Sequence, residues 1–174
     1  MKTIVVYSSQ TGFTRRYAEW IAQAVGADCM DLKEAARADL TAYDAVVFGG
    51  SALAGTIRRL GWLRRRAAGL AGRKLIVFCV GASPIDDPGR IEADLSRNLQ
   101  APEFQNVQAF YCPGGLDYSR MPVSGRAAMG LLRAALKLKR RKTEDEQKML
   151  AMISSSYDIS DRKYIEPILT CLKE

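Results

Sequence analysis

Hydroxyl side chains and one glycine are clustered in segment 8–14, which reads Ser-Ser-Gln-Thr-Gly-Phe-Thr. The apolar run Thr3–Val6 before it predicts a buried strand, and the residues after it predict a helix over 15–25. The first N–H groups of a helix are unpaired, and the helix dipole favours an anion beside them. Ser and Thr hydroxyls add donors, and Gly12 lets the backbone approach an oxygen closely. The segment therefore predicts a site for a small phosphorylated cofactor.

Several other chemistries are excluded because the chain contains no histidine. It has no His-based triad, no imidazole general base and no His-rich metal site. The four cysteines are too dispersed for a zinc site of thiolates, and no other side chain is a compelling general base. We therefore assign no catalytic residue and no metal ligand, and we expect a cofactor to carry any chemistry.

The length and the cysteine usage favour a single cytoplasmic domain over 1–174. A chain of 174 residues, 48% of them hydrophobic, can bury one good core. Cys79 and Cys112 lie in apolar runs, where a free thiol behaves as a small hydrophobe. No apolar run approaches the roughly 20 residues of a membrane span. The first apolar segment is a short strand followed by a polar turn, so we expect no signal peptide and a reduced, cytoplasmic protein.

Positive charge is unevenly distributed along the chain. The formal net charge is +7, and the basic residues form two groups, one within 58–74 and the other within 133–142. Such groups favour anionic partners, for example phospholipid head groups or an acidic protein. Nucleic acid is not expected, because no aromatic residues that could stack on bases accompany the charges.

Strand and helix patterns alternate through the first two thirds of the chain. The strands are continuous apolar runs, which are typical of parallel sheets buried on both faces. The helical stretches between them cover 15–25, 33–38, 57–70 and 90–99. This alternation predicts a three-layer α/β sandwich, with five strands at Thr3–Tyr7, Asp28–Leu32, Ala45–Gly49, Leu75–Val80 and Val107–Cys112.

An insertion of helical character follows the fifth strand, over about 113–155. The residues after Pro113-Gly114-Gly115 predict a long helix over Val123–Lys142. Thr143 and Glu146 form the spacing of a capping box, which predicts a second helix. Ser154–Ser160 form a break, and Asp161–Leu172 read as the closing helix. A minimal fold needs only a few residues here, so we expect the insertion to be functional or an interface.

The pattern Ser9-x-Thr11-Gly12-x-Thr14 after the first strand resembles the phosphate loop of the flavodoxins, which wraps the phosphate of FMN. The resemblance covers essentially the whole chain. It implies a flavodoxin-like sandwich with a five-stranded parallel sheet of order 2-1-3-4-5, and FMN as the cofactor. In such a sheet the ligand lies at the carboxyl ends of strands one, three and four.

The same resemblance implies which residues hold the cofactor. The first loop anchors the phosphate, and the small residues after strands three and four flank the isoalloxazine ring. Both ring loops lack the aromatic residues that commonly stack on flavin, and Phe13 replaces the usual Asn of the phosphate loop. Trp62 or Tyr118 could supply a ring face, although Trp62 falls within a predicted helix and is equally a core residue. The predicted cofactor-binding residues are Ser9, Gln10, Thr11, Gly12, Phe13, Thr14, Ser51, Ala52, Leu53, Ala54, Gly55, Gly81, Ala82 and Ser83.

A narrower resemblance concerns the insertion. The segment Gly115–Met121, followed by the basic and Leu-rich stretch Leu131–Lys142, is similar to the insertion of menaquinone-dependent protoporphyrinogen oxidases. It implies an FMN-dependent oxidoreductase that passes electrons from a reduced substrate to a quinone. The alternatives are a flavodoxin-type electron carrier and a flavodoxin-fold interaction module without cofactor. Against the carrier stands the charge of +7, because a carrier that docks on basic reductases is expected to be acidic.

The two basic groups have a functional and a structural interpretation. The helix near 133–142 could dock on an anionic membrane at the inner face, since each basic residue there adds about 1 kcal/mol. It could instead be a scaffold helix packed on the domain, with its cations in water. Arg58 and Arg59 could bind the propionates of a porphyrinogen, or lie on a solvated helix face.

Overall fold

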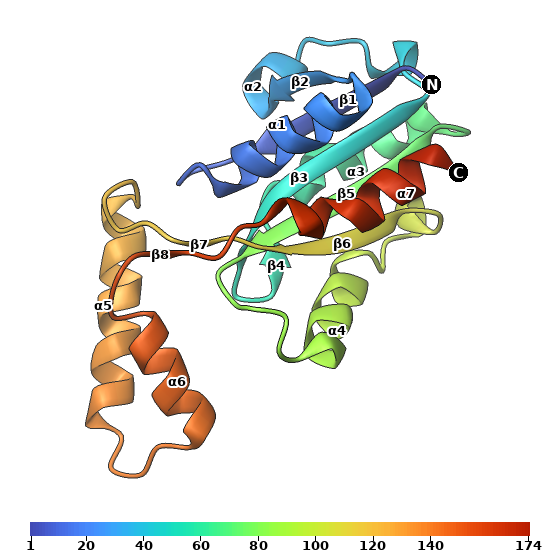
Figure 1. The fold of residues 1–174 in the computed structure, drawn as a ribbon. Coiled ribbons are helices and arrows are strands. Elements are labelled where there is room, and N and C mark those ends of the chain that lie inside the picture. Colours follow the sequence, from blue (N-terminus) through green and yellow to red (C-terminus); the bar gives the residue numbers. More distant parts are fainter.

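The computed structural model describes residues 1–174 and has a central parallel sheet with helices on both faces (Figure 1). The strand order is β2-β1-β3-β5-β6, and a short sixth strand, β4 (Thr56–Ile57), pairs antiparallel with β3. Because β4 shifts the numbering, this order confirms the predicted order 2-1-3-4-5. The parallel strands are β1 (Thr3–Ser8), β2 (Asp28–Asp31), β3 (Ala45–Leu53), β5 (Lys74–Gly81) and β6 (Gln108–Pro113).

Two hydrophobic cores lie on opposite faces of the sheet, since successive side chains of a strand point to opposite sides. One core is covered by α1 (Phe13–Val25) and α7 (Glu166–Lys173). The other is covered by α2 (Leu32–Ala35), α3 (Leu60–Ala67) and the partly buried side chains of α4 (Pro88–Asn98). Cys79 and Cys112 are buried in these cores, as predicted. Short 3-10 turns complete the connections, η1 at Leu40–Ala42, η2 at Ala68–Leu70, η3 at Pro102–Phe104 and η4 at Arg162–Ile165.

Several predicted boundaries change by a few residues for local reasons. Leu32 begins α2 instead of ending the second strand, because the Asp31 carboxylate accepts the Lys33 N–H at 2.9 Å and caps the helix. The helix predicted over 57–70 begins only at Leu60, because Ile57 belongs to β4. Its last predicted turn is the 3-10 turn η2.

The third strand extends past its predicted end at Gly49 and continues to Leu53. Ala54 and Gly55 both have positive φ, as a tight two-residue hairpin turn requires, and the chain returns as β4. The side-chain amide of Asn98 in α4 accepts the Ile57 N–H at 2.9 Å and donates to the Gly55 carbonyl at 2.7 Å. The segment 51–57 is therefore a hairpin pinned to α4, not an open loop.

The predicted insertion forms an arm over 115–160 that projects from the sheet (Figure 1). A two-stranded antiparallel ribbon forms its base, and two helices form the projecting part. The long predicted helix ends at Leu138, so the basic residues 139–142 form the turn between the two helices. The capping box of Thr143 and Glu146 is confirmed. The arm comprises β7 (Gly115–Leu116), α5 (Val123–Leu138), α6 (Glu144–Met152) and β8 (Tyr157–Asp158).

The arm is attached to the first turns of α1. The Arg16 guanidinium bonds to the Asp158 carboxylate and donates to the Ser160 hydroxyl at 2.7 Å. The Tyr17 hydroxyl donates to the Pro113 carbonyl at the end of β6 and accepts the Asp161 N–H at 3.1 Å. These bonds fix both ends of the ribbon beside the loop that precedes α1.

Candidate cofactor-binding site

The loop between β1 and α1 has the features of an anion site. The Ser9 hydroxyl accepts the Gly12 N–H at 3.1 Å, and Gly12 has a left-handed backbone with φ 101°. The first intrahelical bond joins the Arg16 N–H to the Gly12 carbonyl at 3.0 Å. The N–H groups of residues 13–15 make no hydrogen bond, and the first turn of α1 contains no acidic residue. Three backbone donors at a helix N-terminus are therefore free to bind an anion.

The two residues that open α1 have different roles. Thr14 is only 2% exposed, yet its hydroxyl hydrogen-bonds to no other residue. The Thr14 oxygen is not itself a buried orphan atom, so the hydroxyl is free to bond to a ligand in the loop. The Phe13 side chain instead packs into the core under α1, and only its backbone N–H is free for a ligand. This packing explains why an aromatic residue is tolerated where a polar one is usual.

Arg120 of the arm lies directly over this loop. A Cβ on Gly12 would stand 3.0 Å from Nη1 of Arg120. Asp117 accepts the N–H groups of Ser119 and Arg120 at 2.9 and 3.2 Å, and it lies 3.5 Å from Nε of Arg120. The Ser119 hydroxyl contributes most to lowering the pKa of this Asp117 carboxyl. The turn therefore holds a cation above the loop, and no spacing pattern in the chain predicts this contact.

The predicted residues after β3 lie on the β3–β4 hairpin. Ser51, Ala52 and Leu53 belong to the strand, and Ala54 and Gly55 form its tip. The predicted end of the third strand at Gly49 is thus wrong, because strand pairing continues through Leu53 and Thr56. Leu53 is 56% exposed. The hairpin rises from the carboxyl end of β3, next to the loops that follow β1 and β5.

The loop after β5 is held by two tyrosines that no sequence pattern predicts at the site. The Tyr111 hydroxyl donates to the Ser83 carbonyl at 2.8 Å, and the Tyr157 hydroxyl donates to the Ala82 carbonyl at 2.7 Å. Burial raises the pKa of the Tyr157 phenol, which keeps it protonated as a donor. A side chain on Gly81 would clash with the Tyr111 ring, so the close approach requires glycine. The predicted residues 81–83 therefore form a fixed loop at the same edge of the sheet.

The predicted site residues thus lie at the carboxyl ends of β1, β3 and β5 or directly after them, and these strands are neighbours in the sheet. Their carboxyl ends share one edge, where open α/β sheets bind ligands. The sequence matches the flavodoxin domain family, Flavodoxin_5, over residues 4–145. The chain belongs to the flavodoxin domain family. The match ends at the start of α6, so β8 and α7 lie outside it.

Several solved structures resemble the chain at low sequence identity. The Trp repressor binding protein of Bacillus subtilis aligns with a TM-score of 0.50 and 15% identity, over 82% of this chain and 100% of its own. A WrbA-like flavodoxin of Agrobacterium tumefaciens gives 0.48 and 19%, over 71% and 87%. A flavoprotein in complex with FMN from Lactobacillus acidophilus gives 0.46 and 12%, over 64% and 91%. No curated protein matches the sequence.

Neither aromatic residue considered for the ring of the cofactor is free in this flavodoxin domain. Trp62 is buried and stacks on Phe48, with ring centroids 6.0 Å apart and planes at 22°. The Tyr118 hydroxyl donates to the Ile153 carbonyl, and the Arg133 guanidinium lies 5.5 Å from its ring centroid. Trp62 is thus a core residue, and Tyr118 joins the two halves of the arm.

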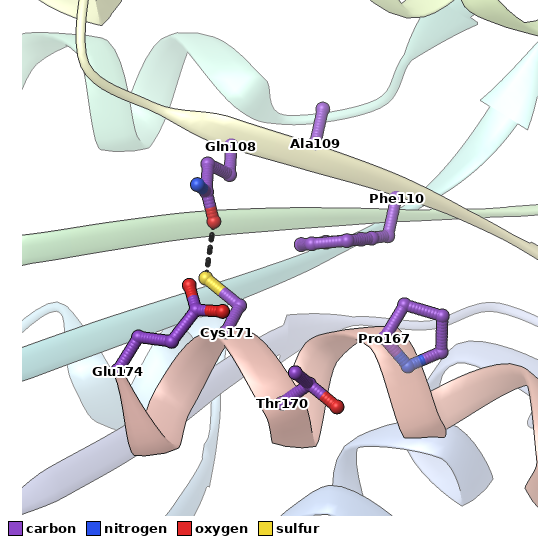
Figure 2. A pocket seen from close by; sticks show the side chains of 7 residues that line it. All are labelled: Gln108, Ala109, Phe110, Pro167, Thr170, Cys171 and Glu174. Carbon is purple, nitrogen blue, oxygen red and sulfur yellow. Dashed lines mark hydrogen bonds between the residues drawn. The ribbon is translucent and has the colours of Figure 1, made fainter.

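A separate cavity of about 500 Å³ lies between β6 and α7 (Figure 2). The Cys171 thiol donates to the side-chain oxygen of Gln108 across it. Gln108 begins β6, so this cavity is at the opposite end of the strand from the phosphate-type loop. None of the predicted cofactor-binding residues lines it.

Proposed function

We propose that this flavodoxin domain protein is an FMN-dependent oxidoreductase that holds the phosphate of FMN in the loop Ser9–Thr14. The observation that carries the proposal is the set of unpaired donors, which comprises three N–H groups of α1 and the Thr14 hydroxyl. These groups suit a phosphate, which accepts several hydrogen bonds at once. When bound, FMN supplies an isoalloxazine ring that can take up and release electrons.

The hairpin and the loop after β5 are the segments that we propose for the ring. Both expose small residues that let the backbone come close, with Ser51 and Ala52 on one side and Ala82 and Ser83 on the other. The two tyrosine hydroxyls occupy the carbonyls of Ala82 and Ser83, so the remaining N–H groups of that loop are held in place as donors. The apolar side chain of Leu53 offers the only large contact surface on the hairpin tip.

The finer part of the proposal concerns the reactants. The arm and the net charge of +7 favour an enzyme similar to menaquinone-dependent protoporphyrinogen oxidases over a bare electron carrier. Removal of two hydrogen atoms from the reduced substrate would balance the reduction of one quinone to its quinol. Arg58 and Arg59 follow the hairpin and form no ion pair, so they offer cations for the carboxylates of a porphyrinogen.

We further propose that the arm contacts an anionic membrane surface, where a quinone would be reached. Helix α5 packs on α6 and buries only Leu136, which supports a role for its exposed face over that of a scaffold helix on the domain. Leu131 and Leu138 are 74% and 85% exposed on one face of α5. Arg140 and Arg141 follow that face without acidic partners. An exposed apolar stripe next to basic residues suits an anionic lipid surface. None of the helices combines the length and the apolar composition that a membrane span requires.

The test of the proposed function begins with cofactor binding. Purified protein should show flavin absorbance, or bind added FMN with quenching of flavin fluorescence. The variant Thr14→Val keeps the side-chain shape and removes the hydroxyl, so it should weaken FMN binding about tenfold at little cost in stability. Colourless protein that does not bind added FMN would contradict the proposal and favour a flavodoxin-fold interaction module without cofactor.

A second assay separates the enzyme from the carrier. Flavin-loaded protein would be mixed anaerobically with protoporphyrinogen and a menaquinone analogue, and porphyrin fluorescence would be followed. Catalytic formation of porphyrin supports the oxidase. A protein that is reduced and reoxidised by general redox partners, without porphyrin formation, would be a carrier.

A further inference from the structure

Three arginines surround the phosphate-type loop, and two of them are already paired. Nε of Arg15 lies 2.7 Å from the Glu19 carboxylate one turn along α1. Arg16 bonds to Asp158 and Ser160 at the base of the arm. The terminal nitrogens of Arg120 make no hydrogen bond, although Nη1 stands over Gly12. Arg120 is therefore the cation left to meet an anion at this loop.

We propose that Arg120 binds the phosphate group of FMN, so that the arm supplies part of the cofactor site. This inference rests on the proposed function. The loop 8–14 contains no acidic residue, so nothing in the loop itself accounts for a guanidinium above it. A guanidinium presents paired N–H donors that match the oxygens of a phosphate.

Asp117 orients Arg120 without occupying its terminal nitrogens. The carboxylate closes the turn 117–120 through two backbone N–H groups and the Ser119 hydroxyl. Its ion pair with the guanidinium is through Nε, at 3.5 Å, and the terminal nitrogens make no hydrogen bond. Nη1 and Nη2 consequently remain available to the phosphate. The side chain is 68% exposed, so salt should screen the interaction.

A consequence follows for the arm. Val123, the first residue of α5, is three positions after Arg120, and the turn between them has no regular structure. A phosphate bound by Arg120 would join this turn to α1. Occupancy of the cofactor site would then restrict the movement of the arm at its base.

The first test compares FMN with riboflavin, which lacks the phosphate. Affinities would be measured by quenching of flavin fluorescence for the wild type, Arg120→Gln and the matched control Arg126→Gln, an exposed arginine of α5 without an ionic partner. Arg120→Gln should weaken FMN binding about tenfold, as loss of a hydrogen bond to a charged group does, and leave riboflavin binding unchanged. Arg120→Lys should restore part of the affinity, and Arg126→Gln should match the wild type.

The outcomes separate the two proposals. Wild-type protein that binds no FMN would overturn the proposed function and this inference with it. Wild-type protein that prefers FMN to riboflavin, with Arg120→Gln keeping the same preference, would overturn only the role of Arg120. An equal loss of both flavins in Arg120→Gln would likewise contradict a phosphate contact.

The second test needs no variant and reads the base of the arm directly. Trypsin cleaves after arginine, so cleavage of the bond between Arg120 and Met121 can be followed by mass spectrometry. FMN at saturation should slow cleavage at this bond, whereas saturating riboflavin should not. Equal cleavage rates with the two flavins would contradict the inference.

Discussion

The Tyr157 hydroxyl, in the second strand of the arm, donates a hydrogen bond of 2.7 Å to the Ala82 carbonyl in the loop after β5. The arm therefore contacts the domain at two places of the candidate site, at this loop and above Gly12. Both places belong to segments that the sequence alone predicts for the cofactor. The arm is therefore joined to the candidate site itself and not only to the outer surface of the domain.

The first prediction concerns this bond. Tyr157→Phe removes the donor and leaves the Ala82 carbonyl without its partner, so the free energy of unfolding should fall by about 1 kcal/mol. Flavin affinity should fall severalfold, because the loop after β5 loses one of its two phenol contacts. Chemical denaturation and flavin titration measure the two effects. The control Tyr43→Phe removes a bond to Asp28 at the amino ends of the strands, the opposite edge of the sheet from the site, and it should leave flavin affinity unchanged.

The second prediction uses the two glycines that flank α1. Gly12 and Gly26 both have left-handed backbone, with φ of 101° and 66°. Replacement of either by Ala should cost about 1–2 kcal/mol of stability through backbone strain. A Cβ at Gly26 meets no atom within 4 Å, whereas one at Gly12 would stand 3.0 Å from Arg120.

Only Gly12→Ala should therefore reduce the affinity for FMN. The loss should be about tenfold or more, because displacement of Arg120 removes one hydrogen bond between charged groups. Calorimetry would measure the stability of both variants, and flavin titration the affinity. If Gly26→Ala reduced flavin affinity as much as Gly12→Ala, the site would not be at this end of α1.

The parallel sheet was predictable because continuous apolar runs are typical of strands buried on both faces, whereas the strand order was implied by the resemblance to the flavodoxins. The phosphate-type loop was predictable because its residues are consecutive. The hairpin was not, because Ser51, Ala52 and Leu53 have no alternation that marks a strand, and their pairing depends on the turn at Ala54 and on Asn98, which is distant in sequence.

The same limit applies to the residues that complete the site. Arg120, Tyr111 and Tyr157 reach the loops only through the path of the chain in space, and no local spacing records such a contact. The end of α5 at Leu138 was also missed, since lysine and arginine favour helix and give no stop signal. Tertiary contacts decide these features.

The third prediction tests whether the substrate is anionic. Charge reversal in Arg58→Glu and Arg59→Glu should raise KM for protoporphyrinogen and leave kcat largely unchanged, because the charges would act in binding. Arg65→Glu, an exposed position of α3 beyond the hairpin, is the matched control. An unchanged KM in the double variant would remove these arginines from the proposed substrate site.

The fourth prediction concerns the membrane surface. Protein should sediment with vesicles that contain phosphatidylglycerol, and less with phosphatidylcholine alone. Arg140→Glu with Arg141→Glu should weaken binding at least 20-fold, on the order of 1 kcal/mol for each basic charge that is lost. Leu131→Ser with Leu138→Ser should weaken it too, whereas Ile85→Ser, an exposed apolar residue outside the arm, should not. If none of the four arm substitutions changed vesicle binding, the arm would not be the membrane-binding surface.

The fifth prediction is a loss of stability at alkaline pH. Burial raises the pKa of the Cys79 thiol from 9.0 to about 12. The unfolded thiol therefore loses its proton before the folded one, so its contribution to stability is complete below pH 9 and falls as pH rises toward 12. The free energy of unfolding should decrease by about 1.4 kcal/mol for each pH unit in this window for one such group.

Urea unfolding from pH 8 to pH 11 in reducing buffer would measure this slope. The Tyr157 phenol adds to the slope above its ordinary pKa of 10.0. Cys79→Ala should lower stability at pH 8 and flatten the slope, and a slope identical to that of the wild type would show that this thiol does not set it.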